Sequence, residues 1–156
     1  MAKVAVMMGS ASDKEVVERA LPILNWFGIE HETVVLSAHR NAAEVAEYVQ
    51  ALPERGFAVV IAAAGMANHL AGTVAARTTL PVIGLPLSGG LMDGLDSLLS
   101  TVQMPGGVPV ATVAVGKAGA TNAGVLAARI IGLSDEGVAS KLIEFASNGF
   151  KLPAGG

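Results

Sequence analysis

Five short apolar runs recur along the chain, separated by stretches whose apolar residues have helical spacing. The runs occupy residues 3–8, 31–36, 57–63, 81–85 and 110–115. The first and third runs are almost continuously apolar, which is typical of parallel strands that are buried on both faces. A chain that alternates such strands with helices is expected to form a parallel sheet with right-handed crossovers.

Helices are expected between and after these runs. The first has an apolar face from Val16 to Leu24, but Pro22 lies inside it and predicts a kink or an interruption near residue 21. Later helices are expected from 41 to about 53, up to about 78, and over about 91–102, 118–131 and 135–146. We therefore predict an α/β protein, a three-layer flavodoxin-like domain with a five-stranded parallel sheet. Residues 1–156 form this single domain, with 147–156 as a loose C-terminal tail.

The composition argues against several classes of function. A net charge of −3 gives no basic surface for nucleic acid, and without cysteine there is no disulfide, thiol nucleophile or thiolate metal site. The three histidines, His31, His39 and His69, lack the spacing of a metal-binding motif, so no metal is expected. No apolar run is long enough for a signal or a membrane span, so we expect a cytoplasmic protein with no membrane partner.

The apolar content is high for a chain of this length. Hydrophobic residues make up 52%, and charged residues 15% against roughly 25% in typical soluble domains. A domain of this size has little interior in which to bury so much apolar surface. Burial between subunits is the favoured explanation. The alternative is that alanine and glycine raise the apolar fraction without forming large exposed patches.

One four-residue loop carries the strongest candidate chemistry. Ser37-Ala38-His39-Arg40 follows the second predicted strand, at the sheet edge where ligands bind in open α/β folds. An imidazole moves protons near neutral pH, and a guanidinium suits an anion such as phosphate. Asn41 is predicted to N-cap the next helix, with Glu44 completing a capping box. The alternative is a polar surface loop without chemistry.

Two other loops follow predicted strands. Gly9-Ser10-Ala11-Ser12-Asp13 offers glycine backbone, two hydroxyls and a helix N-terminus to an anion, while Asp13 suits ribose hydroxyls. The alternative is plain capping, in which Ser12 or Asp13 starts the helix. The segment from Gly65 to Gly72 surrounds His69 with small residues, as in a tight, dry pocket. Alone, His69 is more typical of a capping or hydrogen-bonded structural histidine.

Six short motifs occur together in one order and spacing. They are Met8-Gly9-Ser10-Ala11-Ser12-Asp13, Ser37-Ala38-His39-Arg40, His69-Leu70, Asp96-Ser97-Leu98, Gln103-Met104-Pro105 and Gly116-Lys117-Ala118. In this combination the chain resembles the PurE family, the N5-carboxyaminoimidazole ribonucleotide mutases of purine biosynthesis. The resemblance extends to about residue 146. Each motif is weak alone, whereas the combination is specific.

The resemblance implies a cofactor-free isomerase and a small-molecule ribonucleotide substrate. A carbamate on the exocyclic nitrogen of an aminoimidazole ribonucleotide becomes a carboxylate on ring carbon C4, through carbon dioxide enclosed in the site. His39 matches the family's catalytic, proton-moving histidine. Arg40 and the serines are expected at the phosphate, Asp13 at the ribose, and the loop with His69 around the carbon dioxide. The expected substrate-binding residues are Ser10, Ser12, Asp13, Ser37, Ala38, Arg40, Gly65, Met66, His69 and Leu70. Family members are homo-octamers, which fits the apolar excess.

The sequence departs from the family pattern in the loop around His69, in the segment from Ser88 to Asp93 and in a shorter C-terminal tail. Met66 stands where the family's mutases usually have glycine, and Asn68 where they have alanine.

Two other functions remain as alternatives. The nearer alternative is the family's direct carboxylase branch, which uses free carbon dioxide. Those relatives typically have lysine at the position of Arg40 and lack a histidine matching His69. The remote alternative is a non-catalytic flavodoxin-like binding module. The chain lacks a receiver domain's acidic cluster, and its 4% aromatic content is low for flavin binding.

Overall fold

The computed structural model describes residues 2–153 and contains one all-parallel sheet of five strands. Their order across the sheet is β2-β1-β3-β4-β5. The strands are β1 (Lys3–Met8), β2 (Glu30–Val35), β3 (Phe57–Ala64), β4 (Val82–Pro86) and β5 (Ala111–Thr112). This arrangement confirms the predicted flavodoxin-like architecture.

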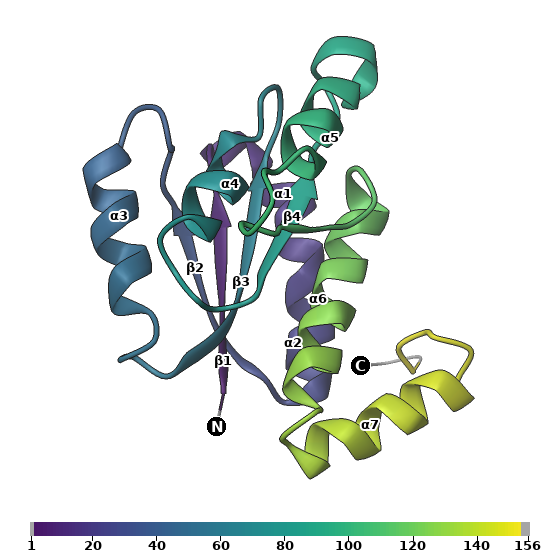
Figure 1. The fold of residues 1–156 in the computed structure, drawn as a ribbon. Helices are drawn as coiled ribbons and strands as arrows, with labels where there is room; N and C mark the ends of the chain where they lie inside the picture. The colour runs from purple at the N-terminus through teal and green to yellow at the C-terminus, as the bar shows by residue number, and fades with distance from the viewer. Residues whose placement is uncertain (1, 154–156) are drawn as a thin grey trace.

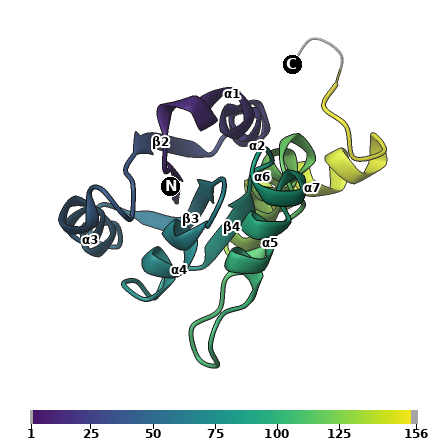
Figure 2. The ribbon, with the colours of Figure 1, turned by 90° about the horizontal axis from the view of Figure 1, so that it is seen from above.

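Helices cover both faces of the sheet (Figures 1 and 2). On one face lie α1 (Lys14–Val17), α2 (Leu21–Phe27) and α6 (Lys117–Ile131), followed by α7 (Glu136–Ser147). On the other lie α3 (Ala42–Ala51) and α4 (His69–Ala75). Because side chains alternate along a strand, Val4, Val6 and Met8 join the first core cluster, and Ala5 and Met7 join the second. Both faces of β1 are thus buried, as its continuous apolar sequence predicts.

The first helical segment is interrupted as Pro22 predicts. A short 3-10 helix, η2 (Glu18–Ala20), separates α1 from α2, and Pro22 occupies the first turn of α2. Proline has no N–H and cannot donate to the preceding turn, but at a helix start that donor is not needed. The segment still buries one continuous apolar side against α6, including Val17, Ala20 and Leu24.

The fifth strand is shorter than predicted. Only Ala111 and Thr112 pair with β4, instead of the whole run 110–115. The backbone N–H groups of Val113 and Gly116 still donate to the carbonyls of Gly84 and Pro86 on β4. The chain therefore follows the sheet edge without forming a regular ladder.

The predicted helix over 91–102 is divided in two. A 3-10 turn, η3 (Leu91–Asp93), precedes α5 (Leu95–Val102), and Gly94 between them has φ +106°. Met92 and Asp93 also have positive φ, which ends any continuous helix. Five large apolar side chains of this segment are exposed, and we call them the α5 apolar face: Leu91, Met92, Leu95, Leu99 and Val102. The inward side instead buries two hydroxyls, Ser97 and Thr101.

The C-terminal segment follows α7 back toward the core. The ring of Phe150 lies 6.1 Å from that of Phe145, and Leu152 packs against the α6 side of the core. Of the predicted loose tail, residues 154–156 lie outside the described residues. Within residues 2–153 no helix has the length and apolar character needed to cross a bilayer.

Candidate functional site

The carboxyl ends of β1 to β4 meet at one edge of the sheet, and the loops that follow them surround a cavity. Parallel register brings these ends together, since Met8 pairs with both Val35 and Ala63, and Ala64 pairs with Pro86. The cavity measures about 400 Å³. Its walls are Gly9, Ser10, Ser12, Asp13, Ser37, Ala38, His39, Arg40, Ala64, Gly65, Met66, Ala67, Leu70, Ser88, Gly89 and Gly90.

The loop after β1 is a capped helical start. Ser10 N-caps the 3-10 turn η1 (Ala11–Asp13), accepting from the Ser12 N–H at 3.3 Å, while the Ser10 N–H donates to the Asp13 carboxylate at 3.2 Å. The two serine hydroxyls lie 2.9 Å apart. The capping alternative therefore describes this turn correctly, although the cap is Ser10 instead of Ser12 or Asp13. Partial burial raises the pKa of Asp13, opposed by its hydrogen bonds with the Ser10 N–H and Ser12.

The loop after β2 is a compact turn that exposes His39 and Arg40. The Asn41 N–H donates to the Ser37 carbonyl at 2.8 Å, and the Ser37 hydroxyl accepts from the Arg40 N–H at 3.3 Å. Arg40 forms no salt bridge with any described residue, so its guanidinium lies at the cavity without an acidic partner among them. Asn41 does precede α3, but the predicted capping box is wrong. Its side chain accepts from the Ser37 N–H at 3.4 Å, and no side-chain cap bond forms.

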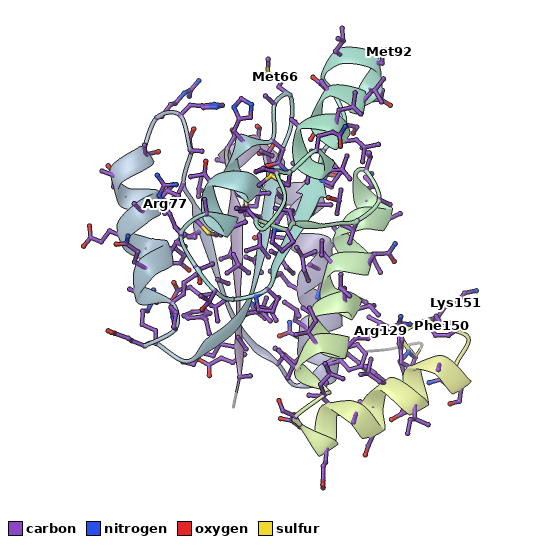
Figure 3. All side chains as sticks on the ribbon, in the orientation of Figure 1. Met66, Arg77, Met92, Arg129, Phe150 and Lys151 are labelled. Atoms are coloured by element: carbon purple, nitrogen blue, oxygen red, sulfur yellow. The ribbon has the colours of Figure 1, made fainter. Side chains whose placement is uncertain are left out.

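The loop after β3 places Met66 at the cavity and Asn68 in the core. Met66 has φ +56° and is 71% exposed, at the top of the loop in Figure 3. Asn68 is fully buried and N-caps α4, where its side chain accepts from the Ala71 N–H and donates to the Leu85 carbonyl. Of the two positions in this loop that depart from the family pattern, only Met66 therefore lines the cavity.

Two hydroxyls of α5 hold this same loop, that of buried Ser97 and that of half-buried Ser100. The Ser97 hydroxyl donates to the Ala64 carbonyl at 2.7 Å and accepts from the Leu87 N–H at 3.1 Å. The Ser100 hydroxyl accepts from the Asn68 N–H at 2.9 Å. Within the described residues, every buried side-chain nitrogen and oxygen has a hydrogen-bond partner. The loop is thus held by a saturated polar network beneath the cavity.

His39 and His69 are bonded to each other. His39 Nε2 and His69 Nδ1 lie 2.7 Å apart, and the two rings are perpendicular with centroids 4.9 Å apart. His69 is the first residue of α4. The hydrogen-bonded alternative for His69 is therefore correct, and its partner is the candidate catalytic histidine. His31, the third histidine, lies in β2 and bonds to Asn25 outside the cavity.

The structure brings the sequence-predicted site residues to one place. All of them line the cavity except His69, which reaches it through its bond to His39. The structure also places Ser88, Gly89 and Gly90 in the cavity wall. Sequence reasoning missed Ser88 and the supporting roles of Ser97 and Ser100. The Asp96-Ser97-Leu98 motif was the only signal for that support.

The fold and cavity define a class: a doubly covered α/β protein with a guanidinium, a carboxyl group and an imidazole pair gathered at one sheet edge. The sequence matches the AIR carboxylase family over residues 3–150. The chain therefore belongs to the AIR carboxylase family.

Several relatives cover nearly the whole chain. It is 52% identical to the N5-carboxyaminoimidazole ribonucleotide mutase of Bacillus subtilis, covering 93% of this chain and 90% of that one. It is 51% identical to the N5-carboxyaminoimidazole ribonucleotide mutase of Saccharolobus solfataricus, covering 95% of this chain and 92% of that one. Among solved structures, Treponema denticola PurE superposes with a TM-score of 0.85 at 31% identity, over 96% of this chain and 92% of that chain.

Proposed function

We propose that this protein is an N5-carboxyaminoimidazole ribonucleotide mutase of de novo purine biosynthesis. The curated relatives that carry this name are about half identical to the chain over almost its full length. The observation that carries the proposal within the molecule is the convergence of His39, Arg40 and Asp13 on one cavity. A ribonucleotide needs a cation for its phosphate, an acceptor for its ribose hydroxyls and, for this reaction, a proton carrier.

The substrate is divided among the three loops. Arg40 and the serine hydroxyls of the first two loops take the phosphate, since a guanidinium forms charge-assisted hydrogen bonds to phosphate oxygens. Asp13 accepts from the ribose hydroxyls. Part of its carboxylate is already bonded to the Ser10 N–H, which holds the remaining oxygen in a fixed direction. The base then lies toward His39 and the loop after β3.

His39 closes the proton balance of the reaction. The carbamate C–N bond breaks, carbon dioxide leaves, and the exocyclic nitrogen accepts a proton from the protonated imidazole. Ring carbon C4 then attacks carbon dioxide, a C–C bond forms, and the C4 proton returns to the now neutral imidazole. Proton uptake and release cancel, so a single imidazole that first donates and then accepts a proton suffices for an isomerisation.

The loop from Ala64 to Ala67 is the proposed enclosure for carbon dioxide. Its small residues leave room beside the imidazole pair, and Met66 supplies an apolar side chain at the rim. A water-poor enclosure keeps a released gas molecule next to its acceptor carbon. Arg40 and His69 both match the mutase pattern, which favours transfer from a bound carbamate over the direct carboxylase reaction.

The activity is tested by supplying the purified protein with N5-carboxyaminoimidazole ribonucleotide. We expect conversion to the C4-carboxylated isomer without added nucleotide, metal or bicarbonate. Absence of turnover with this substrate under conditions where the Bacillus subtilis relative is active would reject the mutase assignment.

A homo-octamer in the cytoplasm is part of the same proposal. Support comes from the α5 apolar face and from exposed Met66, which lies at the same end of the molecule as Met92 (Figure 3). Exposed large apolar side chains that gather in one region mark an interaction site. Light scattering should give about eight times the 15.7 kDa chain mass. A stable, active monomer at micromolar concentration would contradict this assembly.

A further inference from the structure

The hydrogen bond between the two imidazoles occupies one of the two ring nitrogens of His39. His39 Nε2 lies 2.7 Å from His69 Nδ1, a distance at which one nitrogen must carry a proton and the other must accept it. His39 Nε2 is therefore occupied by its neighbour. Nδ1 is the only ring nitrogen of His39 that remains available to a ligand.

The two partners are held very differently. His69 begins α4, and its own N–H donates to the Ala67 carbonyl at 2.8 Å. The preceding residue, Asn68, is completely buried and is bonded to Ser100, Leu85 and Ala71. His39 instead lies in an exposed turn and has no other side-chain hydrogen bond among the described residues. His69 is thus the fixed member of the pair, and His39 is the member it orients.

Resting on the proposed mutase function, we propose that His69 is a positioning residue that keeps the shared proton on His39 Nε2. His39 then exchanges protons with the substrate only through Nδ1. The role is that of the third group in a catalytic triad, which holds an imidazole in one orientation and one tautomer.

The proton count is consistent through the whole cycle. Before reaction the pair carries three protons, on His39 Nδ1, on His39 Nε2 and on His69 Nε2, and one positive charge. Donation from His39 Nδ1 to the substrate nitrogen leaves two protons and a neutral pair. The shared proton stays on His39 Nε2, so Nδ1 now has the lone pair that accepts the C4 proton. Uptake of that proton restores the starting state, and His69 neither gains nor loses a proton.

The choice of substitutions separates positioning from proton transfer. His69 bonds through Nδ1, and the amide of asparagine occupies nearly the same place as Nδ1 of a histidine. Glutamine instead carries its amide near the Nε2 position. We expect His69→Leu to lower kcat on the order of 10²-fold with little change in KM, because the orientation and tautomer of His39 are lost. His69→Asn should recover most of the rate, and His69→Gln should not. Equal losses in the Asn and Leu variants, or normal kcat in the Leu variant, would overturn the proposal.

Nitrogen-15 NMR of the imidazoles tests the bond without any turnover. Neutral His39 in the unmodified protein should be protonated at Nε2, and His69→Leu should convert it to a mixture of tautomers. Neutral His39 protonated at Nδ1 would overturn the proposal even if the enzyme is active. If the unmodified protein fails to convert the carbamate, the mutase function is rejected, while the NMR result still decides whether His69 fixes the tautomer of His39.

Discussion

The two loops that carry the paired histidines reach the same cavity by different means. The turn Ser37–Asn41 is held by hydrogen bonds among its own residues, and it is only partly buried. The loop 64–69 is held from below by Asn68, Ser97 and Ser100, all through bonds to distant parts of the chain. The first loop therefore depends on local sequence, whereas the second depends on the packing of α5 against the sheet.

The locally held turn therefore carries the reacting groups, and the core-anchored loop supports them. The locally held turn exposes His39 and Arg40, the two groups that the proposed reaction needs most. The core-anchored loop supplies a fixed partner and a wall. Substitutions in the turn should therefore change activity with little effect on stability. Substitutions in the anchor of the other loop should change stability first.

The largest expected effect is that of His39→Asn. Turnover should fall by at least ~10² to 10⁴-fold, the usual contribution of a general acid–base group, because no other group replaces the proton carrier. Product affinity and the melting temperature should change little, since His39 is exposed. His31→Asn is the matched control and should remain active, because His31 bonds to Asn25 outside the cavity. Steady-state kinetics showing near-normal turnover for His39→Asn would remove it from the mechanism.

The next effect is on substrate affinity. Arg40→Ala should weaken binding by about 1.5–3 kcal/mol, the usual range for a hydrogen bond to a charged group. Calorimetric titration with the product nucleotide measures this loss. Arg77→Ala is the control, since that guanidinium donates to the Thr73 carbonyl on α4 and lies outside the cavity (Figure 3). If the dephosphorylated nucleoside binds the unmodified protein as well as the nucleotide does, Arg40 has no phosphate to hold.

Two asparagines compare the supports of the two loops directly. Asn68→Ala should lower the free energy of unfolding by about 2 kcal/mol, because it removes a helix cap and leaves a buried carbonyl unpaired. Asn41→Ala should cost less than about 1 kcal/mol, since it removes one long hydrogen bond in a partly buried turn. Urea denaturation of both variants gives the comparison. Equal losses of unfolding free energy in the two variants would mean that the buried network stabilises the protein no more than the partly buried turn does.

Met66→Gly should have the smallest effect, and in the opposite direction. A non-glycine residue at φ +56° is strained, and an exposed side chain loses little burial when it is removed. The unfolding free energy should rise by up to about 1 kcal/mol, offset in part by the greater freedom of glycine in the unfolded chain. Thermal denaturation gives the sign. A clear destabilisation would show that Met66 makes contacts that matter to the fold.

The local parts of this structure could be predicted from the sequence. The apolar runs predicted the buried strands, and Pro22 predicted the helix interruption. The polar loops after the strands predicted the cavity residues. These features depend on neighbours in the chain. The exposure of the leucines of α5 was harder to predict. Apolar residues at helical spacing identify one face of a helix, but they do not show whether that face is buried in the core or lies on the surface.

The features that could not be predicted join distant segments. The bond between His39 and His69 spans 30 positions, and Asn68 contacts Leu85 and Ser100. Residue type alone does not show which polar side chain will cross the core. The capping boxes make the same point locally. The Asn41 side chain accepts a hydrogen bond from the Ser37 N–H and does not cap α3. Ser10 and Asp13 instead form a capping box that the sequence analysis did not assign.

The central claim is that a bound carbamate supplies the carboxyl group. Its most direct test is the fate of isotopic label in N5-carboxyaminoimidazole ribonucleotide, labelled at the carboxyl carbon and converted in excess unlabelled bicarbonate. Release inside the site has the advantage of an intramolecular reaction, so we predict that the product keeps nearly all of the label. Loss of the label, together with faster conversion of aminoimidazole ribonucleotide and bicarbonate, would contradict the account and place the protein in the direct carboxylase branch.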